Sequence, residues 1–322
     1  MRVLVLHSDV APSAPADEQD TLIAAKAVTT ALNERGHHAT GAVFAPEPAM
    51  LRSLLHDTRC DIVFNLVESV FGQGELAGLA PAMLAKIGVP YTGCCAASIA
   101  LTCDKPRTKQ IFRAAGLPTP DWSEPPHWGD IVEGRRYIVK SAVEDASLGL
   151  DDSAVVAGRE TVCERAALCV SRYGGSWFAE TYLDGREFNI ALLEEAGTPR
   201  VLPIPEMRFE GWPASRPRLV NYAAKWDEAS EDSAKTVRLF GIETEEPTLA
   251  LALAGLATRT WDLFGLRGFA RVDFRLDGDG ALMILEVNPN PCIAPDAGFA
   301  AAAAAAGLSY ADTVERILLA AV

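Results

Sequence analysis

The sequence predicts an α/β protein that begins with a parallel sheet and continues into a larger part with mixed α+β structure. Two observations carry this prediction. Short apolar runs alternate with helical patterns over the first hundred residues, and longer strand-like runs dominate after residue 135. Because 322 residues exceed what one hydrophobic core usually serves, we expect several packed domains, with ranges 1–95, 96–183 and 184–322.

Composition and charge argue against several classes of protein. The chain carries 43 acidic and 29 basic residues, a net charge of −14, which disfavours a nucleic-acid partner. Its seven cysteines are odd in number and include no C-x-x-C pair, so we expect reduced thiols in a cytoplasmic protein. The N-terminal apolar run is too short for a signal peptide, and glycines interrupt the alanine-rich run near the C-terminus. We therefore expect no membrane partner.

The first part of the chain alternates predicted strands and helices. Apolar runs predict buried strands at 3–7, 38–44, 61–67 and 89–93. Amphipathic patterns predict helices between them at 17–36, 48–57 and 75–88. This βαβ alternation favours a parallel sheet, whose ligand side lies at the carboxyl ends of its strands.

The remainder of the chain predicts a part richer in strands. A basic helix at 104–116 leads into a loop at 117–130, whose prolines and tryptophans mark a boundary region. Strands are expected at 135–142, 177–183, 187–195 and 200–209, and helices at 159–174, 247–265 and in the alanine-rich C-terminal run. The polar stretch 221–235 is expected to be irregular.

The segment 270–291, ARVDFRLDGDGALMILEVNPNP, predicts a β-hairpin with one apolar and one charged face. The expected apolar residues are Val272, Phe274, Leu276, Leu285 and Val287. With DGDG as a four-residue loop, Arg271 would lie opposite Glu286, and Asp273 one diagonal step away. Two carboxylates and the amide of Asn288 are hard oxygen ligands, which suit Mg²⁺ together with phosphate oxygens. The plain alternative is a solvated outer face of charged side chains.

This hairpin resembles the magnesium-binding end of ATP-grasp ligases, and R-x-D-F followed by LEVNPNP resembles the signature of the D-alanine–D-alanine ligase branch. Further segments resemble that family in the same order along the chain: DKPRTK, YIVK with the loop DASLGL, FAETYLDGREFNIALL and YAAKW. The resemblance implies an ATP-grasp fold. In it, 1–95 would be the substrate-side domain, 96–183 a central subdomain with a flexible phosphate loop, and 184–322 a C-terminal subdomain with the metal-binding hairpin.

The resemblance also implies roles for individual residues. Those expected to bind ATP are Lys105, Lys140, Ser147, Glu180, Tyr182, Leu183, Glu187 and Lys225. Those expected to hold the metal are Asp273, Glu286 and Asn288, with Mg²⁺ as the ion and Mn²⁺ as a substitute. Arg271 and Lys225 are expected to be catalytic, Arg271 by holding an acylphosphate or the oxyanion that follows it. Taken alone, each lysine or glutamate is as compatible with a surface position; the ordered set favours a site.

The implied reaction activates a carboxylate. The γ-phosphoryl group of ATP would move to a substrate carboxylate, and an amine would then displace phosphate from the acylphosphate. We expect small carboxylate and amine substrates, such as amino acids or their derivatives. By analogy with the family, we also expect a homodimer.

Several substrate-side positions depart from the family pattern. Ala297 stands where the family has a serine for the carboxylate of the second amino acid, Ala146 stands in place of a loop serine, and Trp226 replaces a tyrosine. Glu75 is kept, and Asp296 favours a cationic group on the acceptor. We therefore expect an amide-forming ligase for substrates other than two D-alanines.

Three other functions stay open on the sequence. A D-alanine–D-alanine ligase of cell-wall synthesis would require the departures to be tolerated. A non-catalytic nucleotide-binding protein would keep the lysines but need not keep the Arg, Asp, Glu and Asn set of the hairpin. A nicotinamide or flavin enzyme would fit the N-terminal alternation, although no G-x-G-x-x-G follows a strand.

Overall fold

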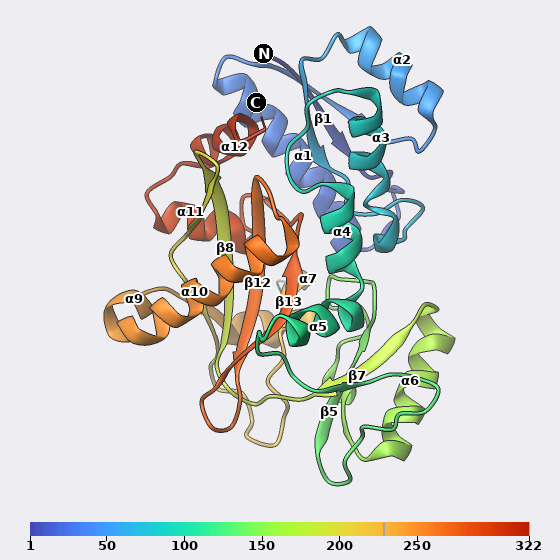
Figure 1. Ribbon diagram of the computed structural model, residues 1–322, viewed down its shortest axis with the longest axis vertical. Helices are drawn as coiled ribbons and strands as arrows, with labels where there is room; N and C mark the ends of the chain where they lie inside the picture. Colours follow the sequence, from blue (N-terminus) through green and yellow to red (C-terminus); the bar gives the residue numbers. More distant parts are fainter. Residues whose placement is uncertain (228, 322) are drawn as a thin grey trace.

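The computed structural model describes residues 1–227 and 229–321 and contains three β-sheets (Figure 1). The N-terminal sheet is parallel, with the order β2-β1-β3. Its strands are β1 (Arg2–His7), β2 (His38–Val43) and β3 (Ile62–Leu66), and its helices are α1 (Ala16–Glu34), α2 (Pro48–Thr58) and α3 (Leu79–Ile87). The predicted parallel sheet is therefore confirmed, and its βαβ alternation accounts for the parallel pairing.

The strand predicted at 89–93 is wrong. This segment contributes only a single parallel bridge, between Val63 and Tyr91. Pro90 has no N–H to donate, and Gly93 turns the chain away with a φ of 81°. The helix predicted at 75–88 also begins later, because a short 3₁₀ turn (Gly74–Leu76) precedes α3.

The N-terminal sheet shares a core with the end of the chain. Helix α1 packs Val28 against the sheet, and the same cluster contains Phe269, Phe299 from α11 (Gly298–Ala305) and Val314 from α12 (Tyr310–Leu319). Figure 1 accordingly shows both termini on the same side of the molecule, with α12 beside α1. The first and last segments of the chain therefore pack as one unit.

The central sheet is antiparallel and has its own core. Its order is β4-β7-β5-β6. The strands are β4 (Trp122–Ser123), β5 (Arg136–Ser141), β6 (Val155–Ala157) and β7 (Trp177–Thr181). Helix α6 (Arg159–Tyr173) covers one face, where Tyr137, Val139 and Trp177 pack with Val162. This small layered unit carries Lys140 at the end of β5 and Glu180 on β7.

The third sheet is the largest, with the order β11-β10-β8-β12-β13 and β9 paired to β8. Its strands are β8 (Glu187–Glu195), β9 (Thr198–Val201), β10 (Glu206–Phe209), β11 (Thr236–Leu239), β12 (Phe269–Leu276) and β13 (Leu282–Asn288). The single strand predicted at 200–209 is wrong, because Pro203 and Pro205 cannot donate to a ladder and divide it into β9 and β10. Helix α10 (Pro247–Phe264) packs Leu253 and Trp261 on this sheet.

The stretch 221–235, predicted to be irregular, forms two short helices. They are α7 (Tyr222–Trp226) and α8 (Glu231–Lys235), and the side chains of Asn221 and Ser230 cap them by accepting backbone N–H groups. Each helix has only 5 residues, too few for an apolar period to show in the sequence. Helix α9 (Ile242–Glu245) is equally short.

Each sheet lies within one of the three expected domain ranges, but the connecting helices do not follow those ranges. Helices α4 (Ala96–Cys103) and α5 (Lys105–Ala114) belong by number to the second range, yet Ile99 and Phe112 lie in the core of the third sheet. The domain boundaries therefore stay a prediction. Within 1–227 and 229–321, no helix has the length and hydropathy needed to cross a membrane.

Gly185 provides a test of how closely the linker between β7 and β8 approaches β12. A Cβ atom at this position would lie 2.2 Å from the carbonyl oxygen of Leu276, a backbone atom that cannot move away without disturbing β12. We expect Gly185→Ala to lower stability by about 2–4 kcal/mol, seen as a lower midpoint of thermal unfolding.

Gly255, inside α10, is the matched control. A Cβ atom there meets nothing within 4 Å. Gly255→Ala should therefore raise the free energy of unfolding by about 0.4–1 kcal/mol, seen as a higher unfolding midpoint. Equal midpoints for the two variants would contradict the close approach at Gly185.

Candidate active site

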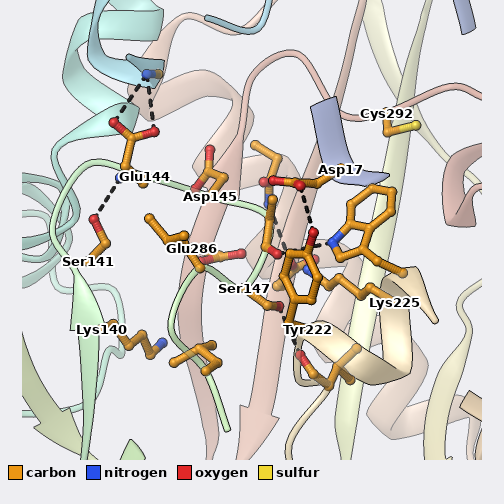
Figure 2. Close-up of a pocket in the computed structure, with 18 of the residues that line it drawn as sticks. Asp17, Lys140, Ser141, Glu144, Asp145, Ser147, Tyr222, Lys225, Glu286 and Cys292 are labelled. Carbon is orange, nitrogen blue, oxygen red and sulfur yellow. Dashed lines mark hydrogen bonds between the residues drawn. The ribbon is translucent and has the colours of Figure 1, made fainter. Parts of the chain in front are cut away.

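A cavity of about 1600 Å³ lies where the three sheets face one another. Its walls come from the loops after β1 and β3, from the central sheet and from the third sheet. Every residue that the sequence singled out as a site residue lines this cavity. Figure 2 shows part of it, with Lys140, Lys225 and Glu286 around a common space.

The predicted register of the metal hairpin is wrong, and the observed register places the two carboxylates directly opposite each other. Asp273 lies directly opposite Glu286, and Arg271 lies opposite Asn288. The turn has five residues rather than four, and a β-bulge follows Asp273, so that one residue of β13 is left unpaired. As a result Ile284 occupies the core, and Leu285, predicted to be apolar core, lines the cavity instead.

The two hairpin carboxylates have different surroundings. Arg271 donates to both oxygens of Asp273, at 2.8 and 2.9 Å, and burial raises the pKa of Asp273 despite this pairing. Burial also opposes ionisation of Glu286, but Lys105, Lys140 and Lys225 outweigh it and lower the pKa of Glu286 to about 2. Glu286 is therefore an ionised carboxylate that faces cations on several sides.

The donor set fits a divalent cation with oxygen ligands. Asn288 donates through Nδ2 to Oδ2 of Asp273 at 3.3 Å, which leaves its own Oδ1 as an acceptor, and Oδ1 of Asp273 retains a further lone pair. In the described chain, no three His, Cys, Asp or Glu side chains gather as a metal cluster. Two carboxylates and one amide form the kind of incomplete set that Mg²⁺ takes up together with phosphate oxygens and water.

Two of the predicted lysines flank these ligands. Lys105, at the start of α5, donates to the carbonyl of Glu144 at 2.9 Å and to Asp145 at 2.7 Å. Burial works to lower the pKa of Lys105, but Asp145 and Glu286 raise it. Burial and Arg271 lower the pKa of Lys225, which extends from α7 into the same space (Figure 2).

Glu180 is held between two lysines, the half-buried Lys140 and the buried Lys109, which the sequence reasoning missed. Ion pairs connect its carboxylate to Lys140 on β5 and to Lys109 on α5. Burial opposes ionisation, but the two ammonium groups hold the pKa of Glu180 below its usual value. Lys109 follows Lys105 by one helical turn, a spacing that could have indicated it. Its Nζ also donates to Thr119 at 2.9 Å.

The far end of the cavity is formed by the connection from β7 to β8. Tyr182 and Leu183 are buried there, and the hydroxyl of Tyr182 donates to Asp184 at 3.0 Å. Burial raises the pKa of Glu187, which lies 3.7 Å from the guanidinium of Arg275. Arg275 is a second missed residue. Since it continues the alternation of Arg271 and Asp273 along β12, period-two counting would have found it.

The loop 145–150 closes over the cavity. Ala146 and Ser147 both adopt left-handed backbone conformations, with φ of 57° and 62°, which cost about 1 kcal/mol or more each for residues other than glycine. Two side-chain bonds hold them: Ser147 donates to the carbonyl of Val220 at 2.9 Å, and Trp226 donates through Nε1 to the carbonyl of Ala146 at 3.1 Å. Trp226 therefore holds the loop in place, and its indole N–H is not free to bind a substrate.

Contacts from the N-terminal part complete this closure. Tyr222 of α7 donates to Asp17 at 2.8 Å, and the N–H of Gly74 donates to Glu144 at 3.1 Å (Figure 2). Asp17, Tyr222 and Glu144 were not predicted, because each contact joins residues far apart in the chain. Glu75, beside Gly74, is exposed at the rim of the cavity.

The wall formed by the N-terminal part is acidic. Burial and the neighbouring Asp20 raise the pKa of Glu68 to about 8. The thiol of Cys292 donates to Asp20 at 2.7 Å, and burial raises the pKa of Asp20 as well. Asp296 and Ala297 border the same region, but Asp296 is exposed. Arg238 of β11, which the sequence reasoning also missed, lines the cavity here.

Solved structures with the same arrangement identify the class of protein. The D-alanine–D-alanine ligase of Bacillus anthracis complexed with ATP matches with a TM-score of 0.75 and 20% identity, over 100% of this chain and 97% of that chain. The ligase of Coxiella burnetii matches with a TM-score of 0.71 and 18% identity, over 99% and 93%. At these identities the likeness concerns the fold, and the fold is that of the ATP-grasp ligases.

Sequence comparison then gives the family. Residues 131–319 match the family described as D-ala D-ala ligase C-terminus. The chain is 32% identical to the uncharacterized protein y4sG of Sinorhizobium fredii, over 91% of this chain and 86% of that protein. It is 30% identical to a D-alanine–D-alanine ligase of Synechococcus, over 94% and 89%. The chain belongs to the D-ala D-ala ligase C-terminus family, as the sequence motifs predicted.

The raised pKa of Glu68 predicts a pH-dependent effect on stability. A carboxyl whose folded-state pKa is raised to about 8 is protonated in the folded protein, so stability is lost as the pH rises from its ordinary pKa through about 8. Glu68→Gln keeps the neutral form at every pH. We expect its midpoint of thermal unfolding to match the wild type at about pH 5 and to exceed it at about pH 8–9.

Glu75→Gln is the control for Glu68→Gln, because Glu75 is an exposed carboxylate of the same cavity. Its unfolding midpoint should follow the wild type at each pH. If Glu68→Gln also followed the wild type throughout, Glu68 would be an ordinary solvated carboxylate.

Proposed function

We propose that this protein is an ATP-dependent, ADP-forming carboxylate–amine ligase that acts on substrates other than two D-alanines. The position of Glu286 is the observation that supports this most strongly. Its carboxylate lies opposite Asp273, and Lys105, Lys140, Lys225 and Arg271 surround it from separate elements. A triphosphate with a divalent cation requires this combination of anionic metal ligands and converging cations.

The proposed nucleotide site extends from these ligands to the connection between β7 and β8. Lys105 and Lys140 would contact phosphates, and the amides of the loop at Ser147 would approach them. The base would lie against Tyr182 and Leu183 near Glu180, with the ribose hydroxyls at Glu187. Mg²⁺ is proposed at Asp273, Glu286 and Asn288, and Mn²⁺ as its substitute. The cation supplies charge neutralisation on the transferring phosphoryl group.

The proposed transfer step uses the cations beside the hairpin. Arg271 is fixed in orientation by its two hydrogen bonds to Asp273, so its remaining donors face a fixed point in the cavity. Such a preorganised donor stabilises negative charge on an acylphosphate and on the oxyanion formed when an amine attacks it. Lys225 has a less constrained ammonium group, which can follow the phosphoryl group during transfer.

The substrate end supports a difference from two D-alanines. Ala297 offers no hydroxyl, and the side-chain donor of Trp226 is already bound to Ala146. Ala146 itself contributes only a carbonyl to that contact. A site without the partners for a given substrate discriminates against it by orders of magnitude. The small residues 297 and 298 also leave room for a larger acceptor.

The experiment that tests the proposed function measures phosphate release from ATP with Mg²⁺ in pools of D- and L-amino acids and small carboxylic acids. Mass spectrometry of the products identifies the acid and the amine together. Amide products with ADP support the ligase, whereas ATP binding without turnover in any pool would indicate a nucleotide-binding protein.

Glu286→Gln should abolish nearly all ATP turnover. The substitution keeps the shape of the side chain but removes one negative charge from the metal ligands, so the cation and the transferring phosphoryl group lose their partner. Steady-state assays of ADP formation should show a loss of at least about a hundredfold, with the unfolding midpoint near that of the wild type. Asp279→Asn, at the exposed tip of the same hairpin, should retain wild-type turnover. Full activity of Glu286→Gln would disprove the metal assignment.

D-Alanine alone, with ATP and Mg²⁺, should give little or no dipeptide. The physical reason is the loss of side-chain partners at Ala146, Trp226 and Ala297, described above. Coupled ADP release and mass spectrometry measure the outcome against the best pair found in the pools. D-Alanyl-D-alanine formed as fast as any other product would show a D-alanine–D-alanine ligase, the alternative favoured by the names of the relatives.

A further inference from the structure

Arg238 is a charged residue of the cavity to which no role has yet been assigned. It lies on β11, the edge strand of the third sheet, opposite Met207 of β10. Its side chain is partly buried and lines the cavity. In the described part of the chain, no carboxylate pairs with its guanidinium, and none of the side-chain hydrogen bonds involves it. A partly buried arginine has lost part of its hydration, and without an anionic partner no ion pair offsets that loss.

The charges near Arg238 distinguish it from the cations that surround Glu286. Burial lowers the pKa of Arg238, Arg271 lowers it further, and Asp296 opposes both effects. The charges that act on Arg271 include Asp273, Glu286 and Asp145. Both arginines line the cavity, but Arg271 is bound to Asp273, whereas Arg238 has no ion-pair partner among the described residues.

Gly298 leaves the guanidinium of Arg238 open to the cavity. A Cβ atom on Gly298 would lie 3.5 Å from Nη2 and 3.8 Å from Cζ of Arg238. No side chain at position 298 therefore covers the guanidinium, and the neighbouring Ala297 is equally small. Asp296, whose charge acts on Arg238, is exposed and forms no ion pair with it. Its effect on a substrate at Arg238 is weakened by solvent.

We propose that Arg238 is a specificity-determining residue that binds a carboxylate of the amine substrate. This inference rests on the proposed function. The planar fork of a guanidinium matches a carboxylate through two parallel hydrogen bonds, which an ammonium or hydroxyl donor cannot reproduce. The amine substrate is then an amino acid or a short peptide with a free carboxylate. This proposal differs from the cationic acceptor expected from Asp296, which stays a prediction.

Pairs of amine substrates that differ only in this carboxylate test the proposal. Each amino acid that the wild type uses as acceptor is compared with its carboxamide, under saturating ATP and acid. We expect the wild type to prefer the free acid by about ten- to a hundredfold in kcat/KM, the range for one charge-assisted contact. Arg238→Gln should remove this preference by raising the KM for the acceptor amino acid in its free-acid form. The KM for ATP should stay unchanged.

Two further variants separate recognition from general damage. Gly298→Leu keeps the arginine but covers it, so it should reduce use of the free acid as Arg238→Gln does. Arg208→Gln changes an exposed arginine on the neighbouring strand, outside the cavity, and should behave as the wild type.

The outcomes distinguish this inference from the function on which it rests. Amide products with an unchanged preference for the free acid in Arg238→Gln would overturn the role of Arg238 and leave the ligase intact. In that case Arg238 would serve as a counter-charge for Asp296. If no amine gave an amide product with the wild type, both proposals would fall together.

Discussion

The arrangement of the cavity depends on one electrostatic constraint, which is the half-buried, ionised carboxylate of Glu286. A carboxylate that has lost part of its hydration needs cations around it, and here they come from α5, β5, α7 and β12. These elements belong to different sheets and cannot adopt their positions independently. The cavity therefore exists only when the central and third sheets face each other. For this reason no single segment of the sequence contains the whole site.

The loop over the cavity is held by a set of bonds that replaces the family pattern. The sequence shows only that Ala146 replaces a serine and Trp226 replaces a tyrosine. Taken alone, the loss of two hydroxyl groups indicates a loop with fewer hydrogen bonds. In the structure the indole N–H of Trp226 and the hydroxyl of Ser147 hold the loop, and Tyr222 of α7 donates to Asp17 of the N-terminal part. The loop is therefore held by contacts between segments that the sequence motifs alone do not show.

Sequence reasoning identified the elements with strong periodicity and the residues within recognisable segments. The parallel N-terminal sheet, the long helices and the hairpin followed from apolar patterns. Elements without an apolar period were missed, as with α7, α8 and β11, although the YAAKW motif did indicate Lys225 and Trp226. Contacts between distant segments were missed too, as for Asp17 with Tyr222. The hairpin register was wrong because a bulge leaves no mark in the apolar alternation. Arg238 was missed because β11 itself was not recognised.

The core shared by the two ends of the chain determines how the molecule can open. Val28, Phe269 and Phe299 pack together, so the N-terminal sheet and the third sheet form one rigid body. The central sheet has a separate core. Its contacts with that body include polar bonds around the cavity and a small apolar cluster of Ile138, Tyr182 and Leu219. A change in the distance between residues 122–181 and that body would alter the width of the cavity while both apolar cores stay intact.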